Sequence, residues 1–431
     1  MIALLTRIHR TLTKPAGFSQ CADVRPPQES VQMIHPTPGS LKANRTLPVR
    51  PLIIPCPDPT AEDRIRDAHR NRALRLARQE HWEVLSALIR HADTNRKLTP
   101  GSMPVAELLA YGARADVVLA VEHALFDLHP EKDAPLLRGI QALEYILEDH
   151  PRDHIIACIV AQAHIDIAWA WRGPLKHAQL APRNRAAFDS HFARATEILV
   201  PFNRTVKTSP LLAATFCALV AGTQTTSRDV ADRYERLIDL NPHNPGPMRA
   251  MGNHLLPRWN GSLAVLELEA RRTAARTQAV WGAGGYTWVM FDAISCDDAA
   301  CAQVDLDFFL EGLRDILARR KDAQTVNLLA AYCAKTMCDT FSDDDKMDQN
   351  RSQIAASADW IVRHHLTELH PMIWAHAAQG FDNNLRIRSA DRFAAAGRAD
   401  AMQFLTLMFK GEIDAGKQIV FTKEGPVAQT C

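Results

Sequence analysis

The sequence predicts an all-α protein built from irregular, stacked helical hairpins. Four helix-like apolar stretches each end in a polar residue followed by a proline. Proline lacks a backbone N–H and moves the residue before it out of the α region, so each site predicts a stop between consecutive helices. Such repeated stops are typical of arrays in which each hairpin buries its apolar face against the next. The four sites are Leu128-His129-Pro130, Asp149-His150-Pro151, Leu240-Asn241-Pro242 and Leu369-His370-Pro371.

Length and composition restrict the class of protein. The chain has 431 residues, 47% of them apolar, which is enough to bury a large core in two or three units or in one extended array. Its formal net charge of +1 gives no overall field that would attract nucleic acid or an acidic membrane. The apolar runs are shorter than the roughly 20 residues that cross a bilayer, and the order of charges after Met1 does not fit a secretory signal. We therefore expect no nucleic-acid partner and no membrane partner.

The cysteines indicate a compartment. There are nine, an odd number, and they are scattered along the chain rather than grouped as in a disulfide framework. This usage favours a reduced, cytoplasmic protein.

Residues 1–57 are set apart by closely spaced prolines, which exclude long helices. We expect this segment to be an extended or disordered tail. Met33 is an alternative start, because nothing before it shows the periodicity of a core helix, so the sequence leaves open whether residues 1–32 belong to the native protein.

Residues 58–409 form the predicted helical-repeat domain. It opens with Thr60, which can cap a helix with Asp63 three residues on, and the chain then runs to Glu80 without glycine or proline. Apolar residues recur at helical spacing through the rest of the domain. The predicted helices span 61–79, 82–92, 104–111, 113–128, 133–149, 153–171, 184–199, 210–221, 227–240, 247–256, 262–278, 284–294, 303–319, 324–339, 350–368, 371–379, 385–396 and 399–409.

Residues 410–431 differ from the helical domain. The run from Lys417 to Thr422 is rich in β-forming residues, and Ala415-Gly416 and Glu424-Gly425 bracket it as turn signals. We predict a short β-hairpin and a tail here.

Residues 228–271 resemble the tetratricopeptide repeat (TPR), a helix pair of about 34 residues with small residues at the helix crossing and a proline near its end. With Pro242 as that proline, Tyr234 and Leu237 take the two preceding apolar positions, and Gly252 and Ala264 take small positions of the next repeat. Arg271 departs from the pattern, because that position is small in the family. A second resemblance is to a Pro-Arg-Trp-Gly-Gly-Ser turn of some uncharacterised bacterial proteins with TPR-like helices, matched here, with Asn for the first Gly, by Pro257-Arg258-Trp259-Asn260-Gly261-Ser262.

The proline stops are not spaced at multiples of the repeat length, so the resemblance indicates a degenerate, TPR-like α-solenoid with unequal helices. It implies partner binding along a concave surface.

Two tryptophan–arginine pairs are the candidate binding residues. Trp171 and Arg172 come just before Gly173, at a predicted helix end, and Arg258 and Trp259 lie in the turn described above. Tryptophan and arginine dominate the binding energy of many interfaces. If the two pairs line one groove, we expect Trp171, Arg172, Arg258 and Trp259 to bind a protein or peptide partner.

A zinc site is an open alternative for four cysteines. Cys296 and Cys301, and again Cys333 and Cys338, have five-residue separations, and four thiolates can hold structural zinc. Five residues along a helix turn two side chains roughly 140° apart, which is poor geometry for a shared ion. A disulfide between Cys296 and Cys301 is a further alternative, and we expect free buried thiols.

The sequence assigns no catalytic, cofactor-binding or metal-binding residue. His364, His365 and Glu368 share a helix face but lack a third ligand, and no Ser/His/Asp order or nucleophile elbow is present. Our first hypothesis is a non-catalytic TPR-like array that binds a protein or peptide. The alternative is an enzyme with a cleft between paired helices and an unknown substrate.

Shape would separate these hypotheses. A closed toroid with carboxylates and histidines facing one pocket would favour the enzyme, and an open arc with a tryptophan- and arginine-lined groove would favour the binder. In a third hypothesis the N-terminal tail occupies the protein's own groove, so that deleting residues 1–57 raises partner affinity. The sequence does not indicate the oligomeric state.

Overall fold

The structure is a computed structural model that describes residues 51–126, 136–173, 179–223, 225–259, 261–338, 344–380, 387 and 389–430. This part of the chain is mostly helical with one small three-stranded sheet, which confirms the predicted helical class. The first proline stop, at residues 128–130, and residues 1–50 of the predicted tail lie outside the described residues.

The helices follow one another along the chain with short connections. In order they are α1 (Ala61–Arg78), α2 (Trp82–Thr94), α3 (Val105–Ala124), α4 (Arg138–Asp149), α5 (His154–Arg172), α6 (Pro182–Leu199), α7 (Pro210–Ala218), α8 (Ser227–Leu240), α9 (Gly246–His254), α10 (Leu263–Arg276), α11 (Gln278–Trp281), α12 (Gly284–Cys296), α13 (Asp298–Gln303), α14 (Leu306–Arg319), α15 (Ala323–Ala331), α16 (Asp345–His365), α17 (Pro371–Gln379), α18 (Ala390–Met408) and α19 (Lys410–Asp414).

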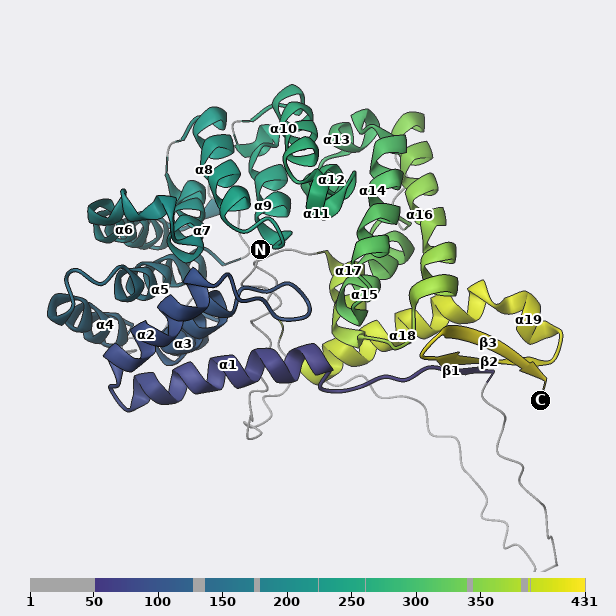
Figure 1. Cartoon of the computed structure of the whole chain (residues 1–431), viewed down its shortest axis with the longest axis horizontal. Helices are drawn as coiled ribbons and strands as arrows, with labels where there is room; N and C mark the ends of the chain where they lie inside the picture. The colour runs from purple at the N-terminus through teal and green to yellow at the C-terminus, as the bar shows by residue number, and fades with distance from the viewer. Residues whose placement is uncertain are drawn as a thin grey trace, which may run out of the picture.

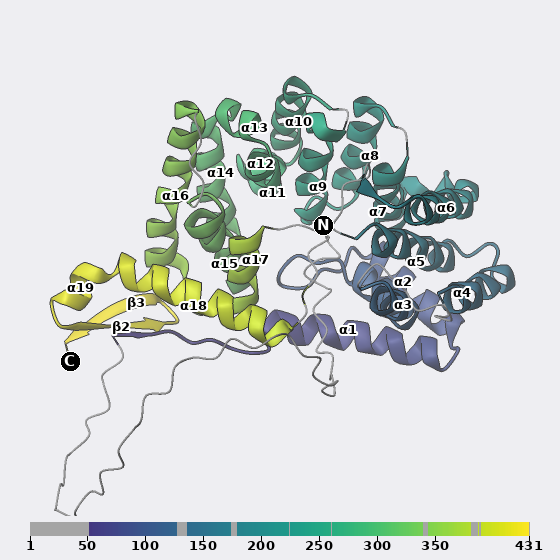
Figure 2. The same cartoon turned by 180° about the vertical axis from the view of Figure 1, so that it is seen from behind.

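Most helices pack on near neighbours in sequence. α1 packs on α3, α3 on α5 and α5 on α6, and further along α9 packs on α12, α12 on α14 and α17 on α18. Figures 1 and 2 show the helices following an arc, with α1 lying along its open side and leading back towards the C-terminal elements. Each helix therefore buries its apolar face mainly against helices close to it in the chain.

The C-terminal hairpin is present and gains a strand from the other end of the chain. β2 (Lys417–Thr422) and β3 (Gly425–Thr430) pair antiparallel, and β1 (Leu52–Ile53) pairs parallel to β2. The Ile419 N–H donates to the carbonyl of Pro51 over 2.9 Å. The described end of the predicted tail, residues 51–57, is thus extended as expected but joins the body through this sheet.

The first helix begins as its sequence predicts. The Thr60 hydroxyl accepts the N–H of Asp63 over 3.1 Å, and the Asp63 carboxylate accepts the N–H of Thr60 over the same distance. This reciprocal capping box satisfies two N–H groups that a helix start leaves without partners.

The described proline stops act in two ways. α4 ends at Asp149 and α8 ends at Leu240, each two residues before a proline. At the last stop, α16 has already ended at His365, and Pro371 is the first residue of α17. Proline is well suited to a first helical position because the N–H there has no intrahelical partner.

The predicted helix ranges are interrupted at Gly112 and at Gly397, but in the structure both glycines lie inside helices, at helix crossings. The predicted helices 104–111 and 113–128 form the single helix α3, and 385–396 and 399–409 correspond to the single helix α18. A Cβ at Gly112 would lie 2.3 Å from the Arg70 carbonyl oxygen, and one at Gly397 would lie 2.2 Å from that of Pro371. These positions lack a side chain because the backbone of another helix occupies its place.

Helix α5 is the one described helix long and apolar enough to cross a membrane by length and composition. Of the segment that meets this criterion, 83% is buried inside the fold, where α5 packs against α3, α4, α6 and α7. A central core helix of a folded domain has these same properties, so the resemblance to a membrane span is weak.

Candidate interaction surface

Arg172 joins two tryptophans from distant parts of the sequence. It is the last residue of α5, which ends at Gly173 with the positive φ of 59° that glycine adopts readily. The guanidinium carbon of Arg172 lies 4.7 Å from the ring centre of Trp169 and 5.9 Å from that of Trp259. Both distances are within the range of a cation–π interaction.

Aromatic side chains continue from this contact in both directions. Together with Arg172 they form a series of stacked and edge-on contacts that we call the aromatic ladder. On one side Trp169 meets two phenylalanines of α6 edge-on, and on the other Trp259 meets His254, which stacks on Tyr234 of α8. The ladder consists of Phe192, Phe188, Trp169, Arg172, Trp259, His254 and Tyr234. Trp169, Arg172, Trp259 and His254 are partly exposed, so the middle of the ladder faces solvent.

His254 is neutral in the ladder. Its Nδ1 lies 2.9 Å from the Ala250 carbonyl oxygen, which can only accept, so Nδ1 carries the proton and Nε2 carries a lone pair. Burial lowers the pKa of His254 to about 4. The Tyr234 hydroxyl, 3.2 Å from Nδ1, helps to fix the ring.

The structure brings two of the four predicted residues into direct contact, Arg172 and Trp259. Trp171 is only 5% exposed and points elsewhere, because successive residues of a helix are about 100° apart, and the Arg183 guanidinium lies 5.3 Å above its ring. Arg258 is exposed and donates a hydrogen bond to Asn253.

Sequence reasoning missed Trp169 and His254 as members of the ladder. Trp169 lies three residues before Arg172, which is a helical neighbour position, so a local signal existed. His254 meets Trp259 only through the fold of the 3₁₀ turn Pro257–Trp259 (η6), and no local pattern marks it.

The start of α6, beside Trp171, carries positive charge and has no capping side chain. Its N-cap, Ala181, provides no side-chain hydrogen bond, no acidic residue lies in the first turn, and Arg183 and Arg185 do. By comparison, α8 begins with the Thr226 hydroxyl accepting the N–H of an acidic residue, Asp229. A helix start carries a partial positive charge, so arginines there add to that charge instead of balancing it.

Two surface depressions lie elsewhere, and no ladder residue lines either of them. One of about 450 Å³ is lined by Lys207, Asp232, Glu235, Arg236, Asp239 and Leu240. The other, of about 380 Å³, is lined by Arg90, His150, Pro151, Arg152 and Asp153.

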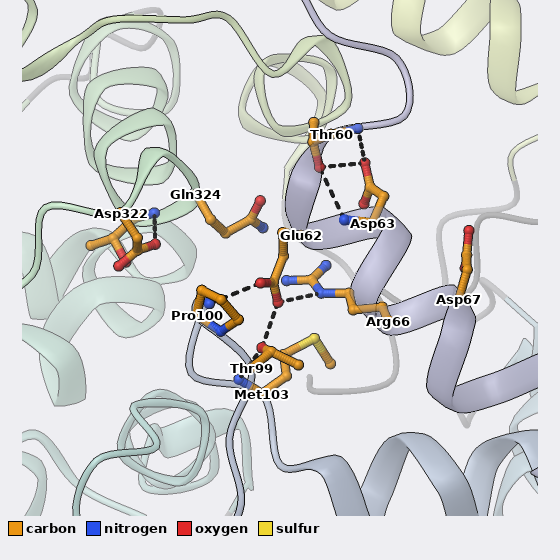
Figure 3. Close-up of polar contacts among 12 residues, drawn as sticks. Thr60, Glu62, Asp63, Arg66, Asp67, Thr99, Pro100, Met103, Asp322 and Gln324 are labelled. Carbon is orange, nitrogen blue, oxygen red and sulfur yellow. Dashed lines mark hydrogen bonds and ion pairs between the residues drawn. The ribbon is translucent and has the colours of Figure 1, made fainter. Parts of the chain in front are cut away.

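A buried carboxylate, Glu62, holds the loop between α2 and α3 (Figure 3). Its oxygens accept hydrogen bonds from Arg66 Nε over 2.8 Å, from Thr99 Oγ1 over 2.6 Å and from the Gly101 N–H over 2.9 Å. The side chain of Glu62 is 5% exposed. Gln324 of α15 also lies close to this loop, since its Cγ would be 3.2 Å from a Cβ at Gly101.

The same loop reaches two further parts of the fold. Arg320, just after α14, donates to the Pro100 carbonyl, and Arg96 Nε donates to the Leu240 carbonyl at the end of α8 over 3.2 Å. Arg96 and Ser102 have positive φ angles of 46° and 64°, which non-glycine residues rarely adopt. These contacts connect α1, α8 and α14 through one loop, so we assign the Glu62 cluster to closure of the fold.

The four cysteines of the zinc hypothesis are thiols in the structure. Cys301 and Cys333 are buried, and burial raises the pKa of Cys301 to about 11, so this group stays protonated. Zinc binds the thiolate rather than the thiol. Across the described ranges, no group of three or more His, Cys, Asp and Glu side chains is placed to hold a metal ion.

Comparison with known proteins found no match: no protein-family model, no curated protein and no solved structure matches the chain.

Proposed function

We propose that the chain is a non-catalytic, TPR-like helical array that binds a protein or peptide on the aromatic ladder. One observation carries the proposal: Arg172 of α5 lies between Trp169 and Trp259, and all three are partly exposed. Stacked guanidinium and indole groups lose little conformational freedom when a partner covers them, which is why such residues dominate binding energy.

Contacts in residues 228–271 support the TPR-like part of the proposal. Tyr234 and Leu237, at the family's apolar positions, are each 3% exposed. A Cβ at Gly252 would lie 1.8 Å from the Val289 carbonyl oxygen, as expected for a small residue at a helix crossing. Arg271, the departure from the family pattern, is on the surface and pairs with acidic side chains there.

The proposed location is the cytoplasm. The described cysteines are free thiols, which supports a reducing compartment. The proposed partners include neither nucleic acid nor a membrane, and the oligomeric state is left unassigned.

The enzyme alternative draws support from a different observation. α1 closes the open side of the arc, and on α3 the half-buried Glu107 has its pKa raised by burial to about 7, a value suited to proton transfer. A general acid or base also needs a reacting partner. No described residue makes a hydrogen bond with the Glu107 side chain, so binding is the favoured function.

Selection of peptides on the native protein tests the proposal. Peptides from a displayed random library that bind the full chain are measured again on Trp259→Ala and Arg172→Ala variants. We expect each variant to lose at least tenfold in affinity, the size of a hot-spot effect. Trp360→Ala, which removes a partly buried tryptophan of α16 outside the ladder, is the matched control and should bind normally.

The proposal fails if the library yields no binder, or if selected peptides bind the folded Trp259→Ala and Arg172→Ala variants as well as they bind the native chain. Circular dichroism and thermal unfolding would show that the variants are folded.

A further inference from the structure

We infer that the aromatic ladder is covered by the protein's own proline-rich segment, residues 26–38, which a partner must displace. This inference rests on the proposed function and specifies how the same site is regulated. Three observations carry it: an indole donor without an acceptor among the rings of the ladder, the composition of the segment, and the length of chain between the segment and β1.

The middle of the ladder has the chemistry that binds proline-rich chain. Trp169, His254 and Trp259 are partly exposed, and the ring centres of His254 and Trp259 are 5.7 Å apart. Within the described part of the chain, Nε1 of Trp259 has no hydrogen-bond acceptor. Proline-rich segments dock on aromatic surfaces, and their backbone carbonyls have no internal partner, so they can accept from an indole. Such an occupant supplies both apolar contact and the missing acceptor.

The segment 26–38 has the matching composition. Two prolines lie at each end of it, and the apolar side chains between them can pack on the rings. Its prolines and large apolar residues are Pro26, Pro27, Val31, Met33, Ile34, Pro36 and Pro38. Because proline already restricts the unbound chain, a segment of this kind loses little conformational freedom when it binds.

Charge distinguishes this segment from the rest of the tail. Residues 1–50 contain seven Lys or Arg, and all seven lie outside residues 26–38. Within the segment the only Asp, Glu, Lys or Arg is Glu29. Arg172, at the centre of the ladder, therefore meets no basic side chain of the segment, whereas the flanking parts of the tail would bring like charge close to it. The charge pattern favours residues 26–38 as the part that docks.

The chain that follows the segment is long enough for docking within one molecule. Residues 39–50, 12 in number, join the segment to Pro51, whose carbonyl accepts the Ile419 N–H in the C-terminal sheet. Fully extended, they span about 40 Å. By comparison α1, which lies along the open side of the arc (Figure 1), has 18 residues and is about 27 Å long. Such a tether holds the segment near the ladder at an effective concentration on the order of 1 mM.

Competition with a synthetic copy of the segment tests the inference on the full chain. The probe is a fluorescent peptide with the sequence of residues 26–38, acetylated and amidated, and its binding is followed by anisotropy. It is titrated with the native chain and with a four-proline variant that carries Pro26→Ala, Pro27→Ala, Pro36→Ala and Pro38→Ala. We expect the probe to bind the variant at least tenfold more tightly, because in the native chain the tethered segment competes with it. Pro48→Ala, in the tail but outside the segment, is the matched control and should bind the probe as the native chain does.

Substitutions in the ladder show where the probe binds. Trp259→Ala, added to the four-proline variant, should weaken probe binding at least tenfold, because it removes the ring and the N–H donor. Trp259→Phe should restore only part of the loss, since phenylalanine keeps an apolar ring but has no N–H. Trp360→Ala, outside the ladder, should leave probe binding unchanged. Circular dichroism shows which variants are folded.

The outcomes distinguish the inference from the proposed function. If the probe binds the native chain and the four-proline variant equally and Trp259→Ala abolishes that binding, the ladder is a peptide site that the tail does not cover, and only the inference is wrong. The same holds if the probe does not bind the variant while peptides selected from the library bind through Trp259. If neither the probe nor any selected peptide depends on Trp259, both proposals fail.

Sedimentation equilibrium tests whether the segment docks within one chain. We expect the native chain and the four-proline variant to have the same oligomeric state. A dimer of the native chain that the variant does not form would assign the segment to the ladder of a second copy and would overturn docking within one chain.

Discussion

At the scale of single residues, two buried histidines have their protonation fixed by their neighbours. His164 Nε2 lies 3.0 Å from a carboxylate oxygen of Glu144, to which Arg194 also donates. The proton of His164 is therefore on Nε2, and its Nδ1 accepts from Nδ1 of His191, 2.8 Å away. Both rings are neutral, and burial lowers the pKa of His191 to about 4.

The first prediction follows from this depressed pKa. An unfolded histidine has a pKa of about 6.5, so below that pH the unfolded chain binds a proton that folded His191 excludes. The contribution of His191 to stability is complete above about pH 6.5 and is lost as the pH falls towards 4, by about 3 kcal/mol. We expect His191→Asn to lower the free energy of unfolding at pH 7 but to reduce its loss between pH 6.5 and 4.5. Urea unfolding at several pH values measures both effects.

His364→Asn, at an exposed position of α16, is the control and should keep the pH profile of the native protein. If the folded His191→Asn variant loses as much unfolding free energy on acidification as the native protein does, groups other than His191 cause that loss. The sequence could place His164 on a helix, but His191 belongs to another helix, and only the packing of α5 on α6 brings the two rings together.

At the scale of elements, local signals predicted most helices and the final hairpin, because caps, proline stops and apolar spacing act within a few residues. Gly112 and Gly397 were misread as breaks, since glycine disfavours a helix whether it interrupts the helix or allows another to approach. β1 escaped prediction because only two of its residues pair, with a strand at the far end of the chain. Of the ladder residues, the sequence predicted Arg172 and Trp259 as binding residues. The others escaped prediction because the contacts of the ladder join separate helices.

The second prediction tests the helix crossing at Gly397. In Gly397→Ala the new methyl would overlap the backbone of α17 at Pro371 and Ala375, so we expect a loss of about 1–3 kcal/mol in unfolding free energy. Gly411→Ala is the matched control in α19, with no atom within 4 Å of the added Cβ. That substitution should be neutral or stabilising by up to about 1 kcal/mol. Equal effects in urea unfolding would contradict a close crossing at Gly397.

At the scale of the whole molecule, contacts between distant segments close the arc (Figure 2). β1 joins the C-terminal sheet, the Leu369 N–H donates to the Pro55 carbonyl over 2.8 Å, and Arg320 donates to the Pro100 carbonyl. These contacts are polar, and Leu52 of β1, which is 3% exposed, adds apolar packing to them. We expect closure to open before the helices on either side unpack, because two of these contacts are single hydrogen bonds.

The third prediction concerns Glu62, which anchors the closing loop to α1. In Glu62→Gln the buried guanidinium of Arg66 keeps its charge without a carboxylate, so we expect unfolding to become easier by about 3 kcal/mol and amides of residues 97–105 to exchange hydrogen faster. X-ray scattering should show a larger radius of gyration if the arc opens. Glu83→Gln, on α2 and 79% exposed, should change stability by less than about 1 kcal/mol. If the loop exchanges at the native rate in folded Glu62→Gln, the carboxylate is dispensable, and closure depends on the pairing of β1 and on the hydrogen bonds to the Pro55 and Pro100 carbonyls.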